Sequence, residues 1–302
     1  MYILLTDLYV KVKTMEICIV GLGLIGGSMA MALKRAGYRV EGFNRSPKPL
    51  QYALENNIVD GSASSFEKYD AVIVALPPQA TVDFILNTPF KKGAIVADIC
   101  GVKRLIEDAV YSADLSINYV GMHPMAGKEV TGIENACADL FDRASMVITH
   151  GRFTDYNSLE TIKTLVKDMG FKYLVECSAE LHDRKIAYTS QLAHVVSNAY
   201  VNDEEIEGCL GFTGGSFQDM TRIAGVDENA WAALYLDNAD NLLNKCNNLI
   251  ACLQGFVKEL EKAQGDGDTA SLAKFLSVGA TAYRNGKAEN FVGDGITVTQ
   301  LK

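Results

Sequence analysis

Continuous apolar runs recur through the first part of the chain and alternate with segments whose apolar residues have helical spacing. Strands are predicted at 16–20, 70–76, 93–99, 119–121, 145–149 and 172–176, and also at 38–43, where apolar and polar residues alternate. The segments that predict helices between them are 27–35, 47–57, 81–86 and 155–169. This alternation is typical of an α/β fold, with a parallel sheet buried on both faces and right-handed crossovers.

From residue 178 onward the pattern changes to long helical segments. They are 179–202, 217–224, 227–263 and 268–284. The segment 227–263 carries an apolar stripe formed by Trp231, Leu234, Leu242, Leu249 and Leu253. This stripe is longer than the surface of one domain needs, so we expect it to bury against a second copy of the chain. The pattern predicts an α/β domain over 15–177, an all-α dimerisation domain over 178–285, and a loosely held tail over 285–302.

A glycine motif directly follows the first strand and opens the first helix. Its residues are Gly21, Leu22, Gly23, Leu24, Ile25 and Gly26. Gly21 permits a tight turn, Gly23 lets the backbone approach a pyrophosphate, and Gly26 lets helix and strand pack closely. The helix N-terminus offers unpaired N–H groups to phosphates. Strand, glycine turn and helix in this order predict an N-terminal Rossmann domain that binds a dinucleotide; the alternative is a glycine-rich turn without a ligand.

The end of the second strand carries Asn44, Arg45 and Ser46 where a dinucleotide-binding fold tests the ribose. An acidic residue there would accept a hydrogen bond from the 2′-hydroxyl and repel a 2′-phosphate. Because the acid is absent and a guanidinium is present, NADP is favoured over NAD. Alternatively, Arg45 stacks on the adenine of either cofactor.

Composition and charge exclude several other classes. The chain has 302 residues, 48% of them hydrophobic, which is long for a single domain. A net charge of -9 argues against a nucleic-acid partner. The seven cysteines are scattered without a C-x-x-C pair, which predicts a reducing compartment and neither disulfides nor a metal site. No apolar run is long enough for a membrane span, so a cytoplasmic location is expected.

Two of the four histidines have neighbours that indicate chemistry. His123 follows a strand end, where a neutral imidazole beside a nicotinamide can accept a hydroxyl proton as hydride leaves the same carbon. Its alternative role is a loop histidine bonded to the backbone. His194 shares a helix face with Ser190, whereas His150 and His182 are interpreted as structural.

One arginine of the helical part is a candidate ligand for a carboxylate. Arg222 stands beside the apolar Ile223 and Ala224, which predicts a buried guanidinium that holds a carboxylate through two parallel hydrogen bonds. The alternative is a helical ion pair with Asp219, worth only tenths of a kcal/mol when exposed.

Five stretches, in order along the chain, resemble the prephenate dehydrogenase family of tyrosine biosynthesis. They are GLGLIGGS (21–28), DICGVK (98–103), HPMAGKE (123–129), SQLAH (190–194) and FQDMTRIA (217–224). The resemblance implies that 15–177 is a dinucleotide-binding domain and that 178–285 is a dimerisation and substrate domain, through which the chain forms a homodimer. It also implies oxidative decarboxylation of prephenate to 4-hydroxyphenylpyruvate with NAD or NADP.

The resemblance further implies roles for individual residues. His123 would be the catalytic base, Arg222 would hold the substrate's ring carboxylate, and Glu129 and His194 would line the substrate pocket. The dinucleotide would be held by the glycine motif with Asn44 and Arg45, and the residues near the nicotinamide would be Leu76, Pro77, Asp98 and Gly101.

Two positions depart from the family pattern. Many members have a serine beside the catalytic histidine where this chain has Gly101, so the hydroxyl that orients the imidazole is missing or replaced by Thr131, Ser28 or water. Gln218 stands where a lysine or arginine is common, which removes a positive charge near the pocket.

Three alternatives stay open at this point. Arogenate differs from prephenate only by an amine in place of the keto oxygen, and the sequence does not separate the two substrates. A related dehydrogenase of 3-hydroxy acids would need a helix-borne catalytic lysine, and none stands out. The missing serine is the one hint of a catalytically inactive sensor that binds the cofactor.

Overall fold

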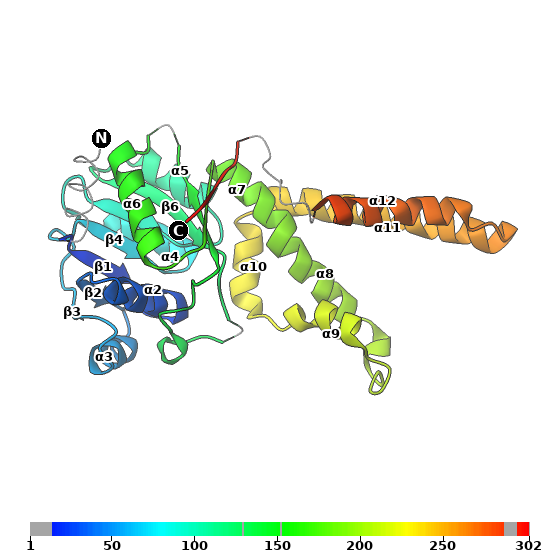
Figure 1. The fold of residues 1–302 in the computed structure, drawn as a ribbon, viewed down its shortest axis with the longest axis horizontal. Helices are drawn as coiled ribbons and strands as arrows, with labels where there is room; N and C mark the ends of the chain where they lie inside the picture. The colour runs from blue at the N-terminus through cyan, green and yellow to red at the C-terminus, as the bar shows by residue number, and fades with distance from the viewer. Residues whose placement is uncertain (1–13, 129, 152, 287–294, 302) are drawn as a thin grey trace. The chain divides into compact units, whose positions relative to one another are not determined.

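The computed structural model describes residues 14–128, 130–151, 153–286 and 295–301 of the chain (Figure 1). The chain divides into two compact units. The first unit consists of Met1–His182 together with Gly295–Lys302, and the second is Asp183–Asp294. The C-terminal end of the chain therefore belongs to the same unit as its beginning.

The described part of the first unit is built on one sheet with the strand order β3-β2-β1-β4-β5-β6-β7-β8-β9. All neighbours from β3 to β6 are parallel, β7 is antiparallel to β6 and parallel to β8, and β9 is antiparallel to β8. The strands are β1 (Ile17–Val20), β2 (Val40–Phe43), β3 (Gly61–Ser62), β4 (Ala71–Val74), β5 (Ile95–Asp98), β6 (Asn118–Pro124), β7 (Ser145–Thr149), β8 (Tyr173–Cys177) and β9 (Thr297–Gln300). The predicted α/β fold with a mostly parallel sheet is confirmed.

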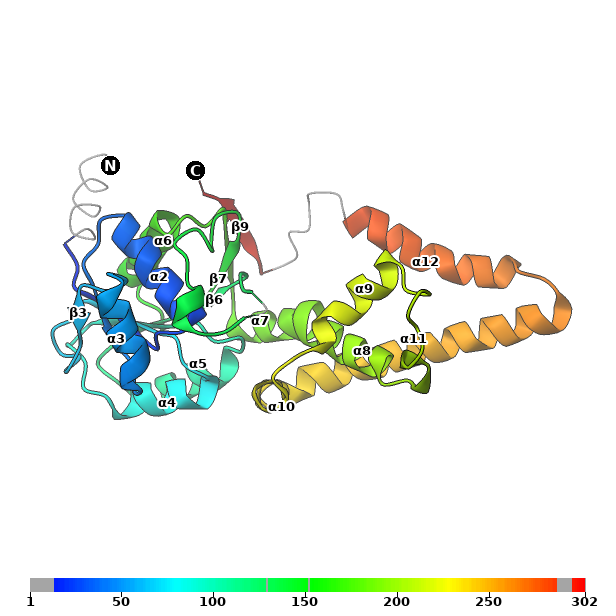
Figure 2. The ribbon, with the colours of Figure 1, turned by 90° about the horizontal axis from the view of Figure 1, so that it is seen from below.

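Helices cover both faces of this sheet. They are α2 (Leu24–Arg35), α3 (Pro47–Glu55), α4 (Pro78–Asn87), α5 (Arg104–Ser112) and α6 (Tyr156–Asp168). α7 (Ala179–Ile186) follows β8 and runs from the first unit into the second. α2 and α6 pack together on one face, and α4 and α5 lie side by side on the other (Figure 2). The sequence patterns did not predict α5, although its buried residues Ile106 and Val110 are four positions apart.

The central strands are apolar at every position because both of their faces are covered. All residues of β1, β4 and β5 are buried. Ile19 and Ile73, which are paired in register between β1 and β4, have no exposed surface. Full burial of an isoleucine side chain stabilises a fold by about 1.5–3 kcal/mol. The continuous apolar runs were therefore a correct signal for strands in the middle of a parallel sheet.

The end of the chain was predicted wrongly as a loosely held tail. Residues 297–300 form β9, which pairs with β8 in a defined antiparallel register, for example Thr299 with Leu174. The side chains of β9 are exposed, so the segment lacks the alternating burial that makes a strand visible in a sequence. Backbone hydrogen bonds to β8, which no side-chain pattern records, hold it at the edge of the sheet.

The second unit is helical, as predicted. After a π-helical turn, η2 (Ala187–Gln191), its elements are α8 (Leu192–Val201), η3 (Glu204–Ile206), α9 (Gly215–Thr221), η4 (Arg222–Ala224), α10 (Glu228–Leu236), α11 (Ala239–Asp266) and α12 (Ala270–Gly286). α11 and α12 form a helical hairpin, and Gly267 ends α11 with a left-handed backbone (Figure 1). None of the helices in the described residues combines the length and the apolar character that crossing a bilayer requires.

The helix predicted over 227–263 is broken into α10 and α11 at Asn238. This residue has no exposed surface, and its amide nitrogen donates to the backbone oxygen of Asp183 at 2.9 Å and to Oε1 of Gln191 at 2.8 Å. Gln191 in turn donates to the backbone oxygen of Leu234 at 3.1 Å. A buried amide needs such partners, and reaching them takes Asn238 out of the helical conformation.

Of the apolar stripe predicted on the long helix, Leu253 is exposed and Leu242 is buried, and the other three residues are partly buried: Trp231, Leu234 and Leu249. The exposed apolar side chains of α11 form a different set that shares only Leu253 with the prediction. They are 47–62% exposed, namely Leu243, Ile250, Leu253, Val257 and Leu260. Successive members stand seven, three, four and three positions apart, which is the spacing of a helix–helix seam. The second unit therefore presents a long apolar face.

Candidate active site

The glycine loop between β1 and α2 has the geometry that its sequence predicts. Gly21 has φ +93°, and a Cβ there would lie 2.3 Å from the backbone oxygen of Ala75. A Cβ on Gly26 would lie 2.0 Å from the backbone oxygen of Gly21. Around Gly23, by contrast, no described atom lies within 4 Å of a Cβ position. The fold needs the outer two glycines, and the middle one leaves open space for a ligand to approach the backbone.

The N-terminus of α2 is free to bind an anion. Gly23 is its N-cap, no side chain caps it, and its first turn contains no acidic residue. The first N–H groups of a helix have no partner within the helix and carry a partial positive charge. An open glycine beside uncapped N–H groups fits the pyrophosphate of a dinucleotide.

Asn44 ties the end of β2 to this loop. Its Oδ1 accepts the N–H of Leu22 at 2.9 Å, and its Nδ2 donates to the backbone oxygen of Ser46 at 2.9 Å. The N–H of Gly21 donates to the backbone oxygen of Phe43 at 2.8 Å. The amide of Asn44 thus shapes the loop, and direct contact of its side chain with a cofactor stays a prediction.

A cavity of about 520 Å³ opens beside the glycine loop, at the carboxyl ends of β1, β2 and β4. This volume lies within the ordinary range of ligand sites. Six residues predicted to bind the cofactor line it: Gly21, Asn44, Arg45, Ser46, Leu76 and Pro77. The other lining residues are Val20, Phe43, Ala80, Asp83 and Phe84. The structure therefore brings these predicted cofactor residues together.

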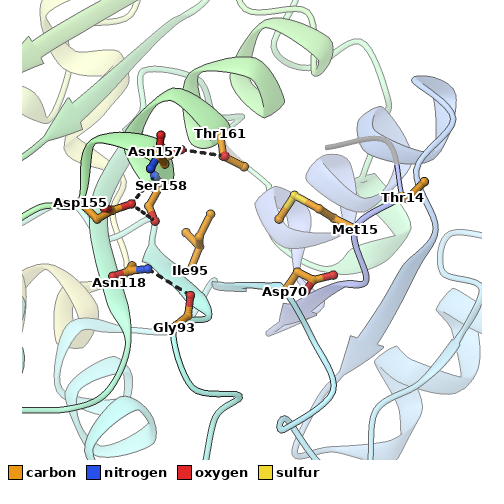
Figure 3. Close-up of a pocket in the computed structure, with 10 residues that line it drawn as sticks. All are labelled: Thr14, Met15, Asp70, Gly93, Ile95, Asn118, Asp155, Asn157, Ser158 and Thr161. Carbon is orange, nitrogen blue, oxygen red and sulfur yellow. Dashed lines mark hydrogen bonds between the residues drawn. The ribbon is translucent and has the colours of Figure 1, made fainter. Parts of the chain in front are cut away.

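A second cavity, of about 580 Å³, lies at the amino ends of β1, β4, β5 and β6 (Figure 3). Its polar side chains already have protein partners. Asp155 caps α6 by accepting from the N–H of Ser158 at 2.8 Å, and Asn118 donates to the backbone oxygen of Gly93 at 3.1 Å. Asp70 accepts from Lys91 at 2.6 Å. Ligands of open α/β sheets bind at the carboxyl ends of the strands, so the cavity beside the glycine loop is the better candidate.

A buried ionic network lies at the end of β5. Asp98 and Lys103 have no exposed surface and form an ion pair. Asp98 also accepts from the hydroxyl of Tyr119 at 2.6 Å and from the N–H of Cys100 at 2.8 Å. Burial and the neighbouring carboxylate raise the pKa of Tyr119 well above its ordinary value, so its hydroxyl keeps its proton and donates. The carboxylate of Asp98, predicted to lie near the nicotinamide, is thus held within the protein.

Lys103 also fixes the backbone next to the candidate base. Its Nζ donates to the backbone oxygen of Met122 at 2.6 Å, one residue before His123. Gly121 makes room for the lysine stem, because a Cβ there would lie 3.1 Å from Cδ of Lys103 and 2.2 Å from the hydroxyl of Thr149. The sequence interpretation missed Lys103 and Gly121, although both lie in or beside the quoted stretches 98–103 and 123–129.

His123 lies in β6 and is held by another histidine. Its Nδ1 is 2.9 Å from Nε2 of His182, and the ring centroids are 5.1 Å apart. Within the described part of the chain, this is the single hydrogen bond that the ring of His123 makes. His182, interpreted from the sequence as structural, is 2% exposed and touches the candidate base directly.

His123 is uncharged at neutral pH. Burial, followed by the neighbouring His182 and Lys103, lowers its pKa well below the ordinary value of 6.5. An unprotonated imidazole nitrogen can accept a proton or a hydrogen bond. The site therefore holds its base in the form that a dehydrogenase needs.

The hydroxyl groups expected to replace the family serine have other positions. The hydroxyl of Ser28 accepts from the N–H of Cys137 at 3.0 Å, and Thr131 is exposed. The thiol of Cys100 lies 3.3 Å from the backbone oxygen of Leu76, and burial raises its pKa, so it is not a nucleophile. For these residues, the structure shows no bond to His123.

In the second unit, α8 packs against η4 and carries His194. Nδ1 of His194 lies 3.0 Å from the backbone oxygen of Ser190, and its ring centroid is 3.9 Å from that of Trp231. A carbonyl oxygen can only accept, so Nδ1 bears the hydrogen and Nε2 is the acceptor of the neutral ring. His194 is thus tied to the preceding helical turn through the backbone of Ser190, and its contact with a substrate stays a prediction.

Arg222 and Glu129 are the two other residues predicted to bind the substrate. Arg222 begins η4 and is exposed, so the prediction of a buried guanidinium is wrong for the single chain. A short turn at a helix end leaves a long side chain on the surface even when its sequence neighbours are apolar. Glu129, predicted to line the substrate pocket, lies outside the described residues.

Two family models match the chain. "Prephenate dehydrogenase, nucleotide-binding domain" matches 29–175, and "Prephenate dehydrogenase, dimerization domain" matches 178–277. The first match begins just after the glycine loop, so the assignment of that loop rests on the geometry described above. Together the models account for both units in the expected order.

Individual relatives agree with these matches. Prephenate dehydrogenase of Bacillus subtilis (strain 168) is 29% identical over 288 residues, which cover 89% of this chain and 75% of that protein. Cyclohexadienyl dehydrogenase of Zymomonas mobilis subsp. mobilis is 27% identical over 265 residues, covering 83% and 90%. The crystal structure of prephenate dehydrogenase from A. aeolicus in complex with hydroxyphenyl propionate and NAD+ has a TM-score of 0.79, with 25% identity, and covers 91% of this chain and 99% of that one.

Proposed function

The chain belongs to the prephenate dehydrogenase family of NAD(P)-dependent oxidoreductases, and we propose that it converts prephenate to 4-hydroxyphenylpyruvate in tyrosine biosynthesis. The observation that carries this proposal is the neutral imidazole of His123, which one sheet holds together with an open dinucleotide loop. Such a pairing suits the removal of hydride from a carbon that bears a hydroxyl group. The B. subtilis and A. aeolicus proteins named above support prephenate as the substrate.

The bound dinucleotide supplies the hydride acceptor. The hydride leaves the ring carbon that bears the hydroxyl, and the bond to the departing CO2 on the opposite carbon breaks, leaving its electrons to complete the aromatic ring. His123 accepts the hydrogen bond of the hydroxyl, and this bond strengthens as hydride leaves; the phenol product keeps the proton. Because aromatisation drives the reaction, the protein mainly orients the groups and places charge.

The remaining pocket residues are assigned by the resemblance. In this proposal Arg222 binds the ring carboxylate of the substrate, since a guanidinium forms two parallel hydrogen bonds with a carboxylate. His194 and Glu129 line the substrate pocket. Within the second unit, α8 packs against η4, which keeps the segments of His194 and Arg222 adjacent. This packing supports a shared role for His194 and Arg222.

One assay tests the reaction as a whole. The purified full chain is mixed with prephenate or arogenate, each with NAD or NADP, and the absorbance of the reduced nicotinamide is followed. We expect turnover with prephenate, and turnover with arogenate alone would assign the chain to arogenate instead. If the cofactor is reduced in none of the four mixtures, the proposed reaction is refuted.

We propose NADP as the preferred cofactor. The turn after β2 has Asn44, Arg45 and Ser46 and no acidic residue, and Arg45 is exposed beside the cavity at the glycine loop. A guanidinium at this position suits a 2′-phosphate. Asp83, which also lines this cavity, is the one nearby acid among its lining residues and favours a cofactor without that phosphate.

Replacing Arg45 by alanine should weaken NADP use selectively. Loss of a charge-assisted contact with phosphate should raise KM for NADP about 10-fold or more, while KM for NAD changes less than about threefold. Steady-state kinetics with both cofactors measure this, and Lys48→Ala, an exposed cation on the next helix, is the matched control. Equal losses with the two cofactors would refute the phosphate contact and leave stacking on the adenine.

We propose that the chain forms a homodimer through its helical unit. The family model for this region describes a dimerization domain. The exposed seam of α11, from Leu243 to Leu260, supplies the apolar surface such a contact needs. A second copy of the same helix is the natural cover for a self-complementary apolar stripe.

An acidic residue in the seam should dissociate this dimer. Leu253→Asp should yield a species with the mass of one chain in sedimentation equilibrium, because it introduces an unpaired charge into the contact. Gln254→Asp places the same charge on the neighbouring, exposed polar position and should remain dimeric. A Leu253→Asp variant with undiminished dimer affinity would show that the contact lies elsewhere.

A further inference from the structure

The contact between His123 and His182 joins two elements that are distant in sequence. His123 is on β6 and His182 on α7, 59 positions later, and Nδ1 of the first lies 2.9 Å from Nε2 of the second. His182 is almost fully buried, so its ring is held in place by the packing of α7. The two ring planes are inclined by 59° with centroids 5.1 Å apart, so the rings are not stacked.

Only one hydrogen can lie between these two nitrogens, and its position decides what His123 can do. A neutral imidazole has one N–H and one acceptor nitrogen. If His182 donates, the hydrogen of His123 is on Nε2, which then cannot accept from a substrate hydroxyl. If His123 donates from Nδ1, its Nε2 is the acceptor.

We propose that His182 is the positioning residue of the active site: its Nε2 accepts the Nδ1 hydrogen of His123 and thereby fixes the ring with Nε2 as the acceptor for the substrate hydroxyl. This inference rests on the proposed role of His123 as the base. Gly101 has no side chain that could orient the ring, and among the described residues the hydrogen bond to the ring of His123 comes from His182.

The surroundings of the pair leave the orientation of the His123 ring as the feature still to be fixed. Lys103 is the charged group that acts on His123 from the segment before α5, and its charge is balanced by Asp98. The backbone of His123 is already fixed through Met122, so rotation of the ring is what remains to be controlled. A hydrogen bond from Nδ1 to a buried ring on α7 removes that rotation.

The arrangement of the hydrogen is directly measurable by nitrogen NMR of the full chain labelled at histidine. The chain has four histidines, and the spectrum of His123→Asn identifies the signals of His123 by subtraction. At neutral pH we expect His123 to show a protonated Nδ1 and an unprotonated Nε2. A protonated Nε2, or rapid exchange between the two forms, would overturn the proposal whether or not the protein oxidises prephenate.

Two substitutions of His182 separate positioning from packing. His182→Gln places an amide oxygen near the position of Nε2 and should keep both the tautomer of His123 and kcat within about threefold. His182→Leu fills space without an acceptor and should lower kcat about 10- to 100-fold with little change in KM, less than the ~10⁴-fold cost of losing a charged orienting partner. Should the leucine variant fail to fold, the glutamine variant and the wild-type spectrum still decide the question. Equal kcat losses in two folded variants would reduce His182 to a packing residue.

Discussion

Replacing His123 by asparagine is expected to lower kcat by about 10²–10⁴-fold and to change KM less than about threefold. Asparagine keeps a polar group in β6, but its amide cannot act as a base. The interaction it removes strengthens only as hydride leaves, so the loss falls on kcat. Steady-state kinetics with prephenate measure the effect.

His150→Asn is the matched control for this change. His150 is a partly exposed histidine near Glu176, outside the proposed site, and its replacement should leave kcat unchanged. Arg222→Ala should instead raise KM chiefly, because the guanidinium binds the ring carboxylate while it is charged in the substrate, and this charge is lost as CO2 leaves. A His123→Asn enzyme with nearly wild-type kcat would assign the base to another residue.

The same base predicts the pH profile. Because the pKa of His123 in the free enzyme is well below 6.5, the acid limb of kcat/KM should lie below pH 6.5, and activity should be level through neutral pH. In the unfolded chain His123 takes up a proton near pH 6.5, whereas in the folded protein it resists protonation. The free energy of unfolding should therefore decrease as the pH falls below 6.5. A limb centred above pH 6.5 would contradict the lowered pKa of His123.

The second large effect is expected from the buried ion pair of Lys103 and Asp98. Lys103→Met should reduce the free energy of unfolding by about 3–5 kcal/mol, because it leaves the carboxylate of Asp98 buried without its cation. Urea unfolding followed by far-UV circular dichroism measures this loss. The lone tryptophan, Trp231, belongs to the second unit and would not report on the sheet.

A double variant and a surface control test the cause. Lys103→Met combined with Asp98→Asn removes both charges and should be more stable than Lys103→Met alone, since an apolar or neutral replacement of a whole buried pair costs little. Lys91→Met breaks the partly exposed pair with Asp70 and should cost less than about 1 kcal/mol. If the losses in free energy of unfolding caused by Lys103→Met and by Asp98→Asn simply add in the double variant, burial of an unpaired charge is not the cause.

Local patterns determined the glycine loop and most of the sheet. Gly21 has a left-handed backbone conformation and Gly26 lies against the backbone oxygen of Gly21, and these requirements are visible in a short motif because the motif contains both the end of the strand and the start of the helix. The strands of the sheet centre were equally visible, because burial on two faces demands apolar residues at every position. The order of the units followed from the change to helical spacing after residue 178.

The tertiary structure alone decided which residues meet. His182 reaches His123 across 59 positions, and Lys103 passes beneath Met122 because Gly121 lacks a side chain. Nothing periodic marks such pairs, since each depends on how separate elements pack. The break of the long helix at Asn238 has the same origin.

What the sequence by itself determined was therefore the α/β fold, the dinucleotide loop and the identity of the candidate base. What only the tertiary structure decided was the environment of that base: its uncharged state, the fixed backbone beside it and its imidazole partner. The physical reason is that backbone geometry and strand burial act over a few residues, whereas desolvation and hydrogen bonding depend on everything packed around a group, wherever it lies in the chain.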